Sequence, residues 1–144
     1  MSIMKSVFRN YYIHTLCTIA SIVLITSCAE NNPYQQGKVL YEVNCGNCHG
    51  LKGEGLGQII PPLANSDYIR DHKSELGCII FSGIKGEIVV NGQKYGTNVM
   101  PGNEKLTDFE MTNIFNYINS SWDKDKKFVE LDTIREGLKK CKPY

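Results

Sequence analysis

The apolar residues of this 144-residue chain recur at helical spacing in several stretches. The best defined stretch follows Thr107, which forms a capping box with Glu110 at the start of a predicted helix. The apolar face of that helix comprises Met111, Ile114, Phe115, Ile118 and Trp122. Such a face needs a partner to pack against. Residues 37–44, with Val39, Leu40 and Val43 at helical spacing, predict an earlier helix.

Two further helices and a hairpin complete the pattern. The segment KSELGCIIFSG, residues 73–83, predicts a helix that ends at Gly83. Residues 131–141 predict a final helix with one apolar face. In EIVVNGQKYG, residues 87–96, β-branched residues precede an Asn91-Gly92 turn, which favours a short β-hairpin. We expect this hairpin to position the loop that follows it, which contains Met100. The chain is therefore expected to be mostly helical.

The first 27 residues have the pattern of a secretion signal. Lys5 and Arg9 form a small positive region, the stretch from Tyr11 to Thr26 is largely apolar, and Ser27 precedes Cys28. This arrangement resembles a bacterial lipoprotein signal, so we predict that Cys28 is acylated and anchors the mature chain to a membrane. An ordinary signal peptide and an uncleaved anchor stay open as alternatives, although an apolar run of about 16 residues is short for a membrane span.

All three alternatives carry the rest of the chain across a membrane, so we expect an extracytoplasmic protein on the periplasmic side. Residues 28–36, CAENNPYQQ, are polar and resemble a short tether. The length of the remaining chain suits one globular domain, which we place at residues 37–122. Residues 123–144 form a helical extension that begins with the solvated connector DKDKK and packs back on the domain.

Composition narrows the classes of partner. The chain is 42% hydrophobic and 22% charged, with a formal net charge of +1, and loss of Lys5 and Arg9 with the signal would leave it close to neutral. It contains no basic cluster interleaved with aromatic residues, such as a phosphate-tracking surface requires. Nucleic acid is therefore excluded as a partner.

The motif CGNCH at residues 45–49 is the main candidate for chemistry. A structural zinc site would need four protein ligands, and His72 is the only other histidine outside the signal. A thioredoxin-like dithiol would follow a strand, whereas a predicted helix precedes this motif. Attachment of haem c needs two thiols for the two vinyl groups and an adjacent histidine below the iron, which Cys45, Cys48 and His49 supply on one helical turn. We therefore predict one covalently bound haem c.

An iron held by His49 has a second axial position to fill. The segment TNVMPG, residues 97–102, holds Met100 before Pro101, where a rigid turn would present the thioether sulfur. The methionines of the signal are removed with it, and Met111 lies on a helix face. Although a methionine often only fills a core, we predict that Met100 is the second axial ligand.

Two cysteines, Cys78 and Cys141, remain outside the signal, the lipidation position and the CGNCH motif. In an oxidising compartment two such cysteines favour a disulfide. Cys141 continues the apolar face of the final predicted helix, which consists of Leu131, Ile134, Leu138 and Cys141. Cys78 lies in another apolar stretch, so we expect the two to pair. The alternative is that both are separate small core residues.

Residues 37–122 resemble a small bacterial class I cytochrome c domain. The resemblance rests on four motifs in the same order, which are CGNCH, GEGLGQIIPPLANSDYI, VNGQKYGTNVMPG and LTDFEMTNIFNYINSSW. It implies an all-α class I cytochrome c fold, with three to four helices around one covalently bound haem, a short β-hairpin and here an extra C-terminal helix. It also implies that the Pro61 carbonyl accepts a hydrogen bond from His49 Nδ1 and that Leu63 packs on the haem face. In the family the first and last helices of the domain cross closely, which here would bring Gly37 and Tyr41 to Phe115 or Tyr117. Gly37 would permit that close approach, although a plain N-terminal turn explains this glycine equally well.

With His49 and Met100 both on the iron, the iron cannot readily bind a substrate, so the predicted function is that of a one-electron carrier rather than an enzyme. It would serve an extracytoplasmic respiratory or related chain through redox partner proteins that bind transiently, with no small-molecule substrate. Two alternatives stay open. One is a haem subunit of a larger oxidoreductase complex. The other is a peroxidase-like or gas-binding protein with a labile Met100, for which His72 is the sole candidate acid–base residue.

Overall fold

The structure is a computed structural model that describes residues 11–19 and 33–141. These belong to two units, which are described separately. In the first unit, residues 11–19 are helical. Cys28, with its predicted lipid anchor, and most of the predicted signal lie outside the described residues. Among the parts of the chain that are described, none of the helices has both the length and the apolar character needed to cross a membrane.

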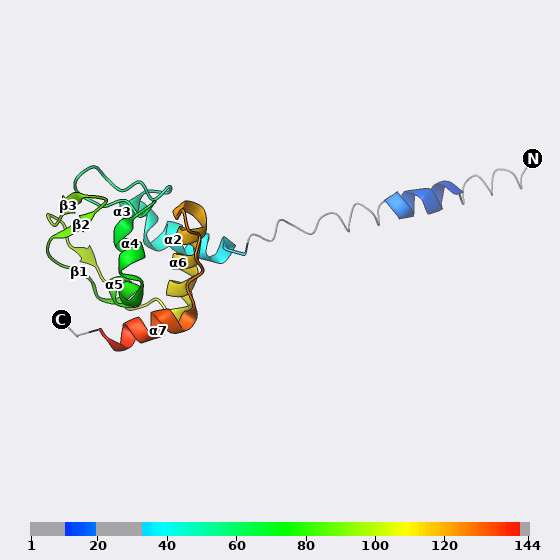
Figure 1. Ribbon diagram of the computed structural model, residues 1–144. Coiled ribbons are helices and arrows are strands. Elements are labelled where there is room, and N and C mark those ends of the chain that lie inside the picture. Colours follow the sequence, from blue (N-terminus) through cyan, green and yellow to red (C-terminus); the bar gives the residue numbers. More distant parts are fainter. Residues whose placement is uncertain (1–10, 20–32, 142–144) are drawn as a thin grey trace, which may run out of the picture. The chain divides into compact units, whose positions relative to one another are not determined.

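The second unit is mostly helical (Figure 1). Its helices are α2 (Gln35–Asn44), α3 (Gly46–His49), α4 (Asp67–Asp71), α5 (Leu76–Ser82), α6 (Asp108–Trp122) and α7 (Leu131–Lys139), with a 3-10 helix at Lys73–Glu75. Its four short strands are β1 (Gly83–Ile84), β2 (Ile88–Val90), β3 (Gln93–Tyr95) and β4 (Met100–Pro101). They form two antiparallel pairs, β1 with β4 and β2 with β3. The predicted helical fold with a small hairpin and an extra C-terminal helix is confirmed.

Helices α2 and α6 pack closely in the centre of the core. Gly37 permits this contact, because a Cβ atom at that position would overlap the Asn113 carbonyl and Cβ of Tyr117 on α6. Tyr41 has no exposed surface, and its ring centroid lies 5.5 Å from that of Tyr117 and 5.2 Å from that of Trp122. The expected pairing of these two helices is present, and of the two explanations for Gly37 the contacts support close approach.

The predicted starts and ends of several elements are also present. The Thr107 hydroxyl accepts a hydrogen bond from the Glu110 N–H at 3.3 Å, and the Glu110 carboxylate accepts one from the Thr107 N–H at 2.8 Å. Helix α5 ends at Gly83, whose φ of 77° suits glycine. The hairpin turns at Asn91 and Gly92, which both have positive φ. These local signals therefore set the boundaries that the sequence predicted.

A buried asparagine of α6 helps to hold the extension that follows this helix against the domain. The side-chain amide of Asn116 donates to the Val129 carbonyl at 3.0 Å, and its oxygen accepts from the Val129 N–H at 2.7 Å. The sequence suggested a fully solvated connector before Val129. In the structure, however, Asp123 is buried, and its Oδ1 lies 4.0 Å from Nη1 of Arg70. Its remaining residues, 124–128, are exposed.

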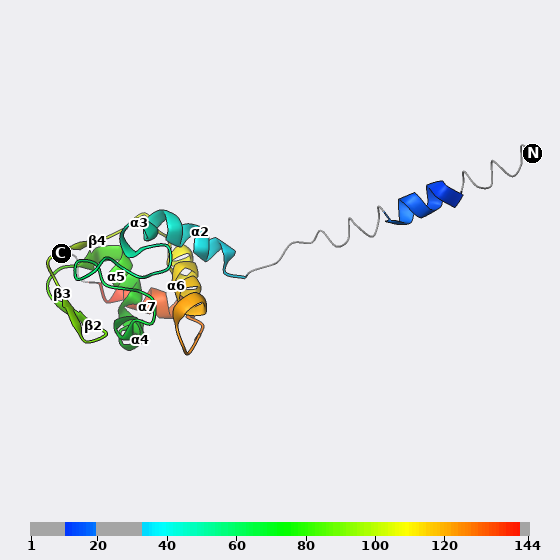
Figure 2. The same cartoon turned by 90° about the horizontal axis from the view of Figure 1, so that it is seen from above.

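Helix α7 then lies across α5 and the start of α6 (Figure 2). The sequence analysis predicted Cys141 on the apolar face of this helix. The helix ends at Lys139, however, so Cys141 lies beyond it. The reason is a tightened last turn, in which the Cys141 N–H donates to the Leu138 carbonyl at 3.1 Å, three residues back. The structure nevertheless links Cys141 to Cys78 of α5 by a disulfide, with their Cα atoms 5.3 Å apart.

Two asparagines of α6 provide a matched test of how the extension is held. We expect Asn116→Ala to lower the free energy of unfolding by about 2–4 kcal/mol, because it leaves the buried N–H and carbonyl of Val129 without partners. The control is Asn113→Ala, whose side chain makes only an exposed 3.3 Å hydrogen bond to Gln36; its effect should stay within about 0.5 kcal/mol. Urea unfolding of the purified proteins measures both, and equal midpoints would contradict this role of Asn116.

Candidate functional site

The CGNCH motif forms a compact turn directly after α2. The Cys48 and His49 N–H groups both donate to the Cys45 carbonyl, at 3.1 Å and 2.9 Å, and Gly50 ends the turn with a φ of 80°. Cys45 is half-buried, Cys48 is exposed and His49 is buried. One helical turn thus presents two thiols and an imidazole together, as predicted.

A hydrogen bond to the backbone orients the imidazole of His49. Its Nδ1 lies 2.9 Å from the Pro61 carbonyl, so the bond that the family resemblance implied is present. Burial lowers the pKa of His49, and the bond to Pro61 opposes this only in part. A neutral ring that donates through Nδ1 keeps the lone pair on Nε2 for a metal.

The loop that carries Pro61 is itself fixed to the turn. The Gly55 N–H donates to the His49 carbonyl at 2.8 Å. Gly55 has a φ of 70°, and a Cβ atom there would overlap the Ile60 carbonyl. The glycine therefore lets residues 55–61 fold back onto the motif, which brings the Pro61 carbonyl to the imidazole.

Tyr41 supports the site in a way that the sequence analysis missed. Its hydroxyl donates to the Gly50 carbonyl at 2.6 Å, which holds the residue immediately after His49. Burial raises the pKa of the Tyr41 phenol well above its usual value, so the hydroxyl stays a donor. The position of Tyr41 four residues before Cys45 was the available signal, since residues one turn apart share a helix face.

Met100 lies in strand β4, which pairs with β1 at the end of α5, with Met100 opposite Ile84 and Pro101 opposite Gly83. This pairing was not expected, because a two-residue ladder leaves no periodic pattern in the sequence. The β2–β3 hairpin, which the sequence analysis expected to position Met100, lines the larger cavity with Ile88 and Tyr95. It is bonded to the start of α4, where the Asp67 carboxylate accepts from the Asn91 N–H at 2.7 Å.

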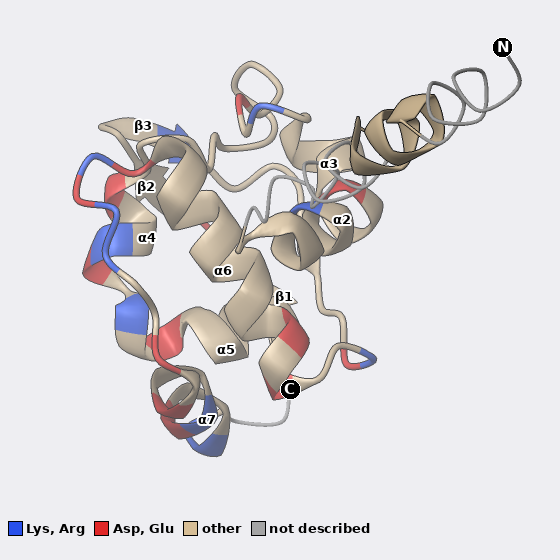
Figure 3. Cartoon of the chain, turned by 90° about the vertical axis from the view of Figure 1, so that its right-hand side faces the viewer, with Lys and Arg blue, Asp and Glu red and all other residues tan. Residues whose placement is uncertain are grey.

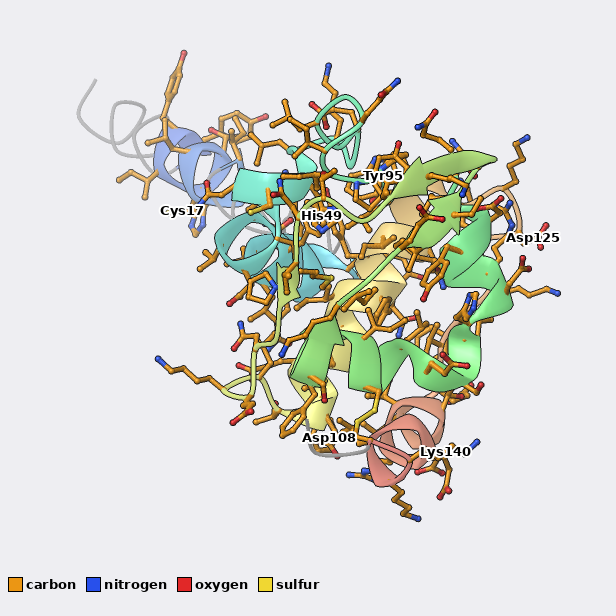
Figure 4. All side chains as sticks on the ribbon, turned by 90° about the vertical axis from the view of Figure 1, so that its left-hand side faces the viewer. Cys17, His49, Tyr95, Asp108, Asp125 and Lys140 are labelled. Carbon is orange, nitrogen blue, oxygen red and sulfur yellow. A yellow bond between two sulfur atoms is a disulfide. The ribbon has the colours of Figure 1, made fainter. Side chains whose placement is uncertain are left out.

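The predicted site residues surround one apolar crevice. It comprises two cavities of about 250 and 70 Å³ that share His49, Pro61, Ile84, Ile88 and Met100. Cys48 lines the larger cavity, whereas Cys45 and Leu63 line the smaller one. In Figure 4, His49 and Tyr95, which also lines the larger cavity, lie toward one end of the domain, and Lys140 beside α7 lies toward the other. Cys78 and Cys141 do not join the site.

The residues present fit a covalently attached haem. Two thiols and an imidazole leave one turn beside an apolar crevice, and a thioether reaches the same crevice from another element. This donor set suits a flat, mostly apolar macrocycle with a central iron. Haem c would be held by Cys45 and Cys48, with His49 placed to bind the iron.

The other interpretations of CGNCH fit less well. Burial, with Cys48 nearby, raises the pKa of the Cys45 thiol to about 11, whereas a reactive dithiol needs a lowered one. Within the described residues no three His, Cys, Asp or Glu side chains are grouped so that they could hold a metal ion. His72 lines neither cavity; its ring stacks on Tyr68 at 3.9 Å.

Comparison with known families supports the same assignment. A family model described as cytochrome c matches residues 34–122, from just before α2 to the end of α6. A comparison with curated proteins gave no match. The matched region covers well over half of the chain and contains every residue that lines the crevice. The chain therefore belongs to the cytochrome c family, whose domains hold haem c covalently and serve in electron transfer.

Proposed function

We propose that the protein is a one-electron carrier of the class I type, with thioether bonds from Cys45 and Cys48 and with His49 and Met100 as axial ligands. The observation that carries this proposal is that His49 and Met100 line the same apolar crevice from two different elements, α3 and β4. With both axial positions taken, no position is open for a substrate. The protein then transfers electrons and is not an enzyme.

The bound haem supplies a one-electron iron couple. The protein sets the potential of that couple through its ligands and its crevice. His49 is kept in one tautomer by the Pro61 carbonyl, which strengthens its donation to the metal. Leu63 and Phe115 line the inner cavity, where their apolar side chains would exclude water. Together with a methionine ligand, this apolar lining favours the ferrous state and raises the potential.

Electron exchange would take place at the edge of the crevice beside Cys48. Cys48 is exposed, and Ile59 and Val99 of the larger cavity are 47% and 58% exposed. A small exposed apolar edge suits redox proteins that bind briefly and leave. Transient redox partners are therefore the partners we propose.

The location of the protein is proposed from the N-terminal pattern. A positive region, an apolar stretch and Ser27 before Cys28 support export followed by acylation of Cys28. The tether after Cys28 would keep the domain next to the membrane on its periplasmic side. The matched cytochrome c region starts at residue 34, which leaves only a short segment between anchor and domain.

Two methionines test the axial ligand. In the ferric wild-type protein we expect a low-spin spectrum with a far-red sulfur-to-iron charge-transfer band. Met100→Ala should abolish the band and lower the midpoint potential by on the order of 0.1 V. Met111→Leu, a buried residue of α6 that lines neither cavity, should keep both. A high-spin wild-type spectrum would instead favour a peroxidase-like or gas-binding protein.

Two cysteines test the membrane anchor. Expression in cells competent in haem maturation and lipoprotein processing should give a membrane-bound protein whose intact mass corresponds to residues 28–144 plus one haem and acyl groups. Cys28→Ala should release the haem protein from the membrane fraction, because acylation is lost. Cys17→Ala, inside the predicted signal, should leave the mature mass unchanged. Membrane binding that survives Cys28→Ala would refute the lipid anchor.

A further inference from the structure

We propose that the C-terminal extension, residues 123–141, positions Met100 by binding to both α5 and α6 and so restricting the movement of α5. The extension lies beyond the region that matches the cytochrome c family. It contributes no residue to the crevice, so it acts through α5. This inference rests on the proposed ligation of iron by Met100. The residues that position the ligand are the Cys78–Cys141 pair and Ile134.

The first step is that α5 carries the strand of Met100. Gly83 ends α5 and opens β1, which pairs with β4. The Asn103 N–H donates to the Ile80 carbonyl at 2.8 Å, so the chain after Met100 is also bonded to α5. Gly102 lies against the same helix end, since a Cβ atom there would overlap the Phe81 carbonyl. Any movement of α5 would therefore move Met100.

The second step is that α5 depends on outside support. It has only seven residues and no side-chain cap at its start. A helix this short is marginal by itself and needs packing on its faces. One face, with Leu76, Ile79 and Ile80, lines the inner cavity. The face away from the crevice must be covered by something else.

The third step is that α7 covers that face at very short range. A Cβ atom at Gly77 would lie 2.6 Å from the Ile134 carbonyl, and one at Gly137 would lie 2.8 Å from the Ser74 carbonyl. Ile134 has no exposed surface. The Cys78–Cys141 disulfide then joins α5 to the end of the extension. Two backbones in contact and one covalent bond leave α5 little freedom to shift.

The fourth step is that the extension is also attached to α6. Arg135 donates to the Asp108 carboxylate at 2.6 Å and lies 5.3 Å from the ring centroid of Phe109. Asn116 holds Val129 at the other end of the extension. Because α6 packs on α2, which leads into the His49 turn, the extension connects the part of the domain that carries His49 with the part that carries Met100. Figure 3 shows several Lys, Arg, Asp and Glu residues on α7, whereas α5 carries none.

The consequence concerns the competition between Met100 and other ligands for the iron. If α5 is held, Met100 stays at the iron and a small external ligand must displace it. If the extension is loosened, β4 moves away more easily and the external ligand binds more tightly. Imidazole is a suitable probe, since it binds ferric iron only where Met100 has left. Coupling between separate sites typically changes affinity by about 5- to 150-fold.

The test measures imidazole binding to the ferric holoprotein by loss of the far-red charge-transfer band. The paired variant Cys78→Ser with Cys141→Ser removes both thiols, so that no free thiol can bind the iron. We expect its apparent dissociation constant for imidazole to fall about fivefold or more. Ile134→Val, a milder change that keeps the disulfide, should shift the constant in the same direction by about twofold. It secures the test should the serine variant fail to fold.

The matched control is Met111→Ala, which changes a buried residue of α6 that lines neither cavity. Urea unfolding gives the loss of global stability for each variant. At comparable losses, Met111→Ala should leave the imidazole dissociation constant at the wild-type value. Equal effects in all variants, or no effect in the extension variants, would overturn the positioning role while His/Met ligation stands. A wild-type protein without the charge-transfer band would overturn the ligation itself and this inference with it.

Discussion

The structure depends on one constraint, which is that an imidazole and a thioether from distant segments must meet at a single apolar crevice. His49 reaches it from α3, the short helix that follows α2, and Met100 reaches it from a two-residue strand. Several contacts of the core hold the imidazole. The α2–α6 contact at Gly37, the Tyr41 hydroxyl on Gly50 and the Pro61 carbonyl on His49 fix the imidazole in position and in tautomer. The thioether has no comparable set of hydrogen bonds, so its position depends on the backbone around α5.

The sequence predicted what short-range chemistry decides. CGNCH places two thiols and an imidazole on one turn, Thr107 with Glu110 starts a helix, and Asn91 with Gly92 turns a hairpin, each through residues at most a few positions apart. Pro61 and Leu63 were expected from the cytochrome c resemblance, and Met100 from its place in a Met-Pro turn. The fold brings all three to the crevice. Their positions in the sequence alone would not have shown that they meet.

The features that the sequence did not predict involve backbone groups far apart in the chain. Pairing of β1 with β4 needs only two residues on each side and no side-chain pattern, so the hairpin seemed the better support for Met100. The Asn116 side chain bonds to both backbone groups of Val129, although its sequence context shows only a polar residue in an amphipathic helix. Cys141 left the predicted helix face because its last turn tightens. Tertiary contacts decide all three.

The way the extension is held also bears on where the protein works. Its charged connector has little apolar surface to bury, so its backbone is satisfied by the side chains of Asn116 and Asn119, the latter donating to the Lys127 carbonyl at 2.9 Å. Such bonds hold a chain in place but contribute little net free energy. A disulfide that closes the long loop from Cys78 to Cys141 restricts the unfolded chain instead. That bond persists where the compartment is oxidising. An extension attached in this manner therefore suits a domain that operates outside the cytoplasm, in agreement with the location proposed from its N-terminal pattern.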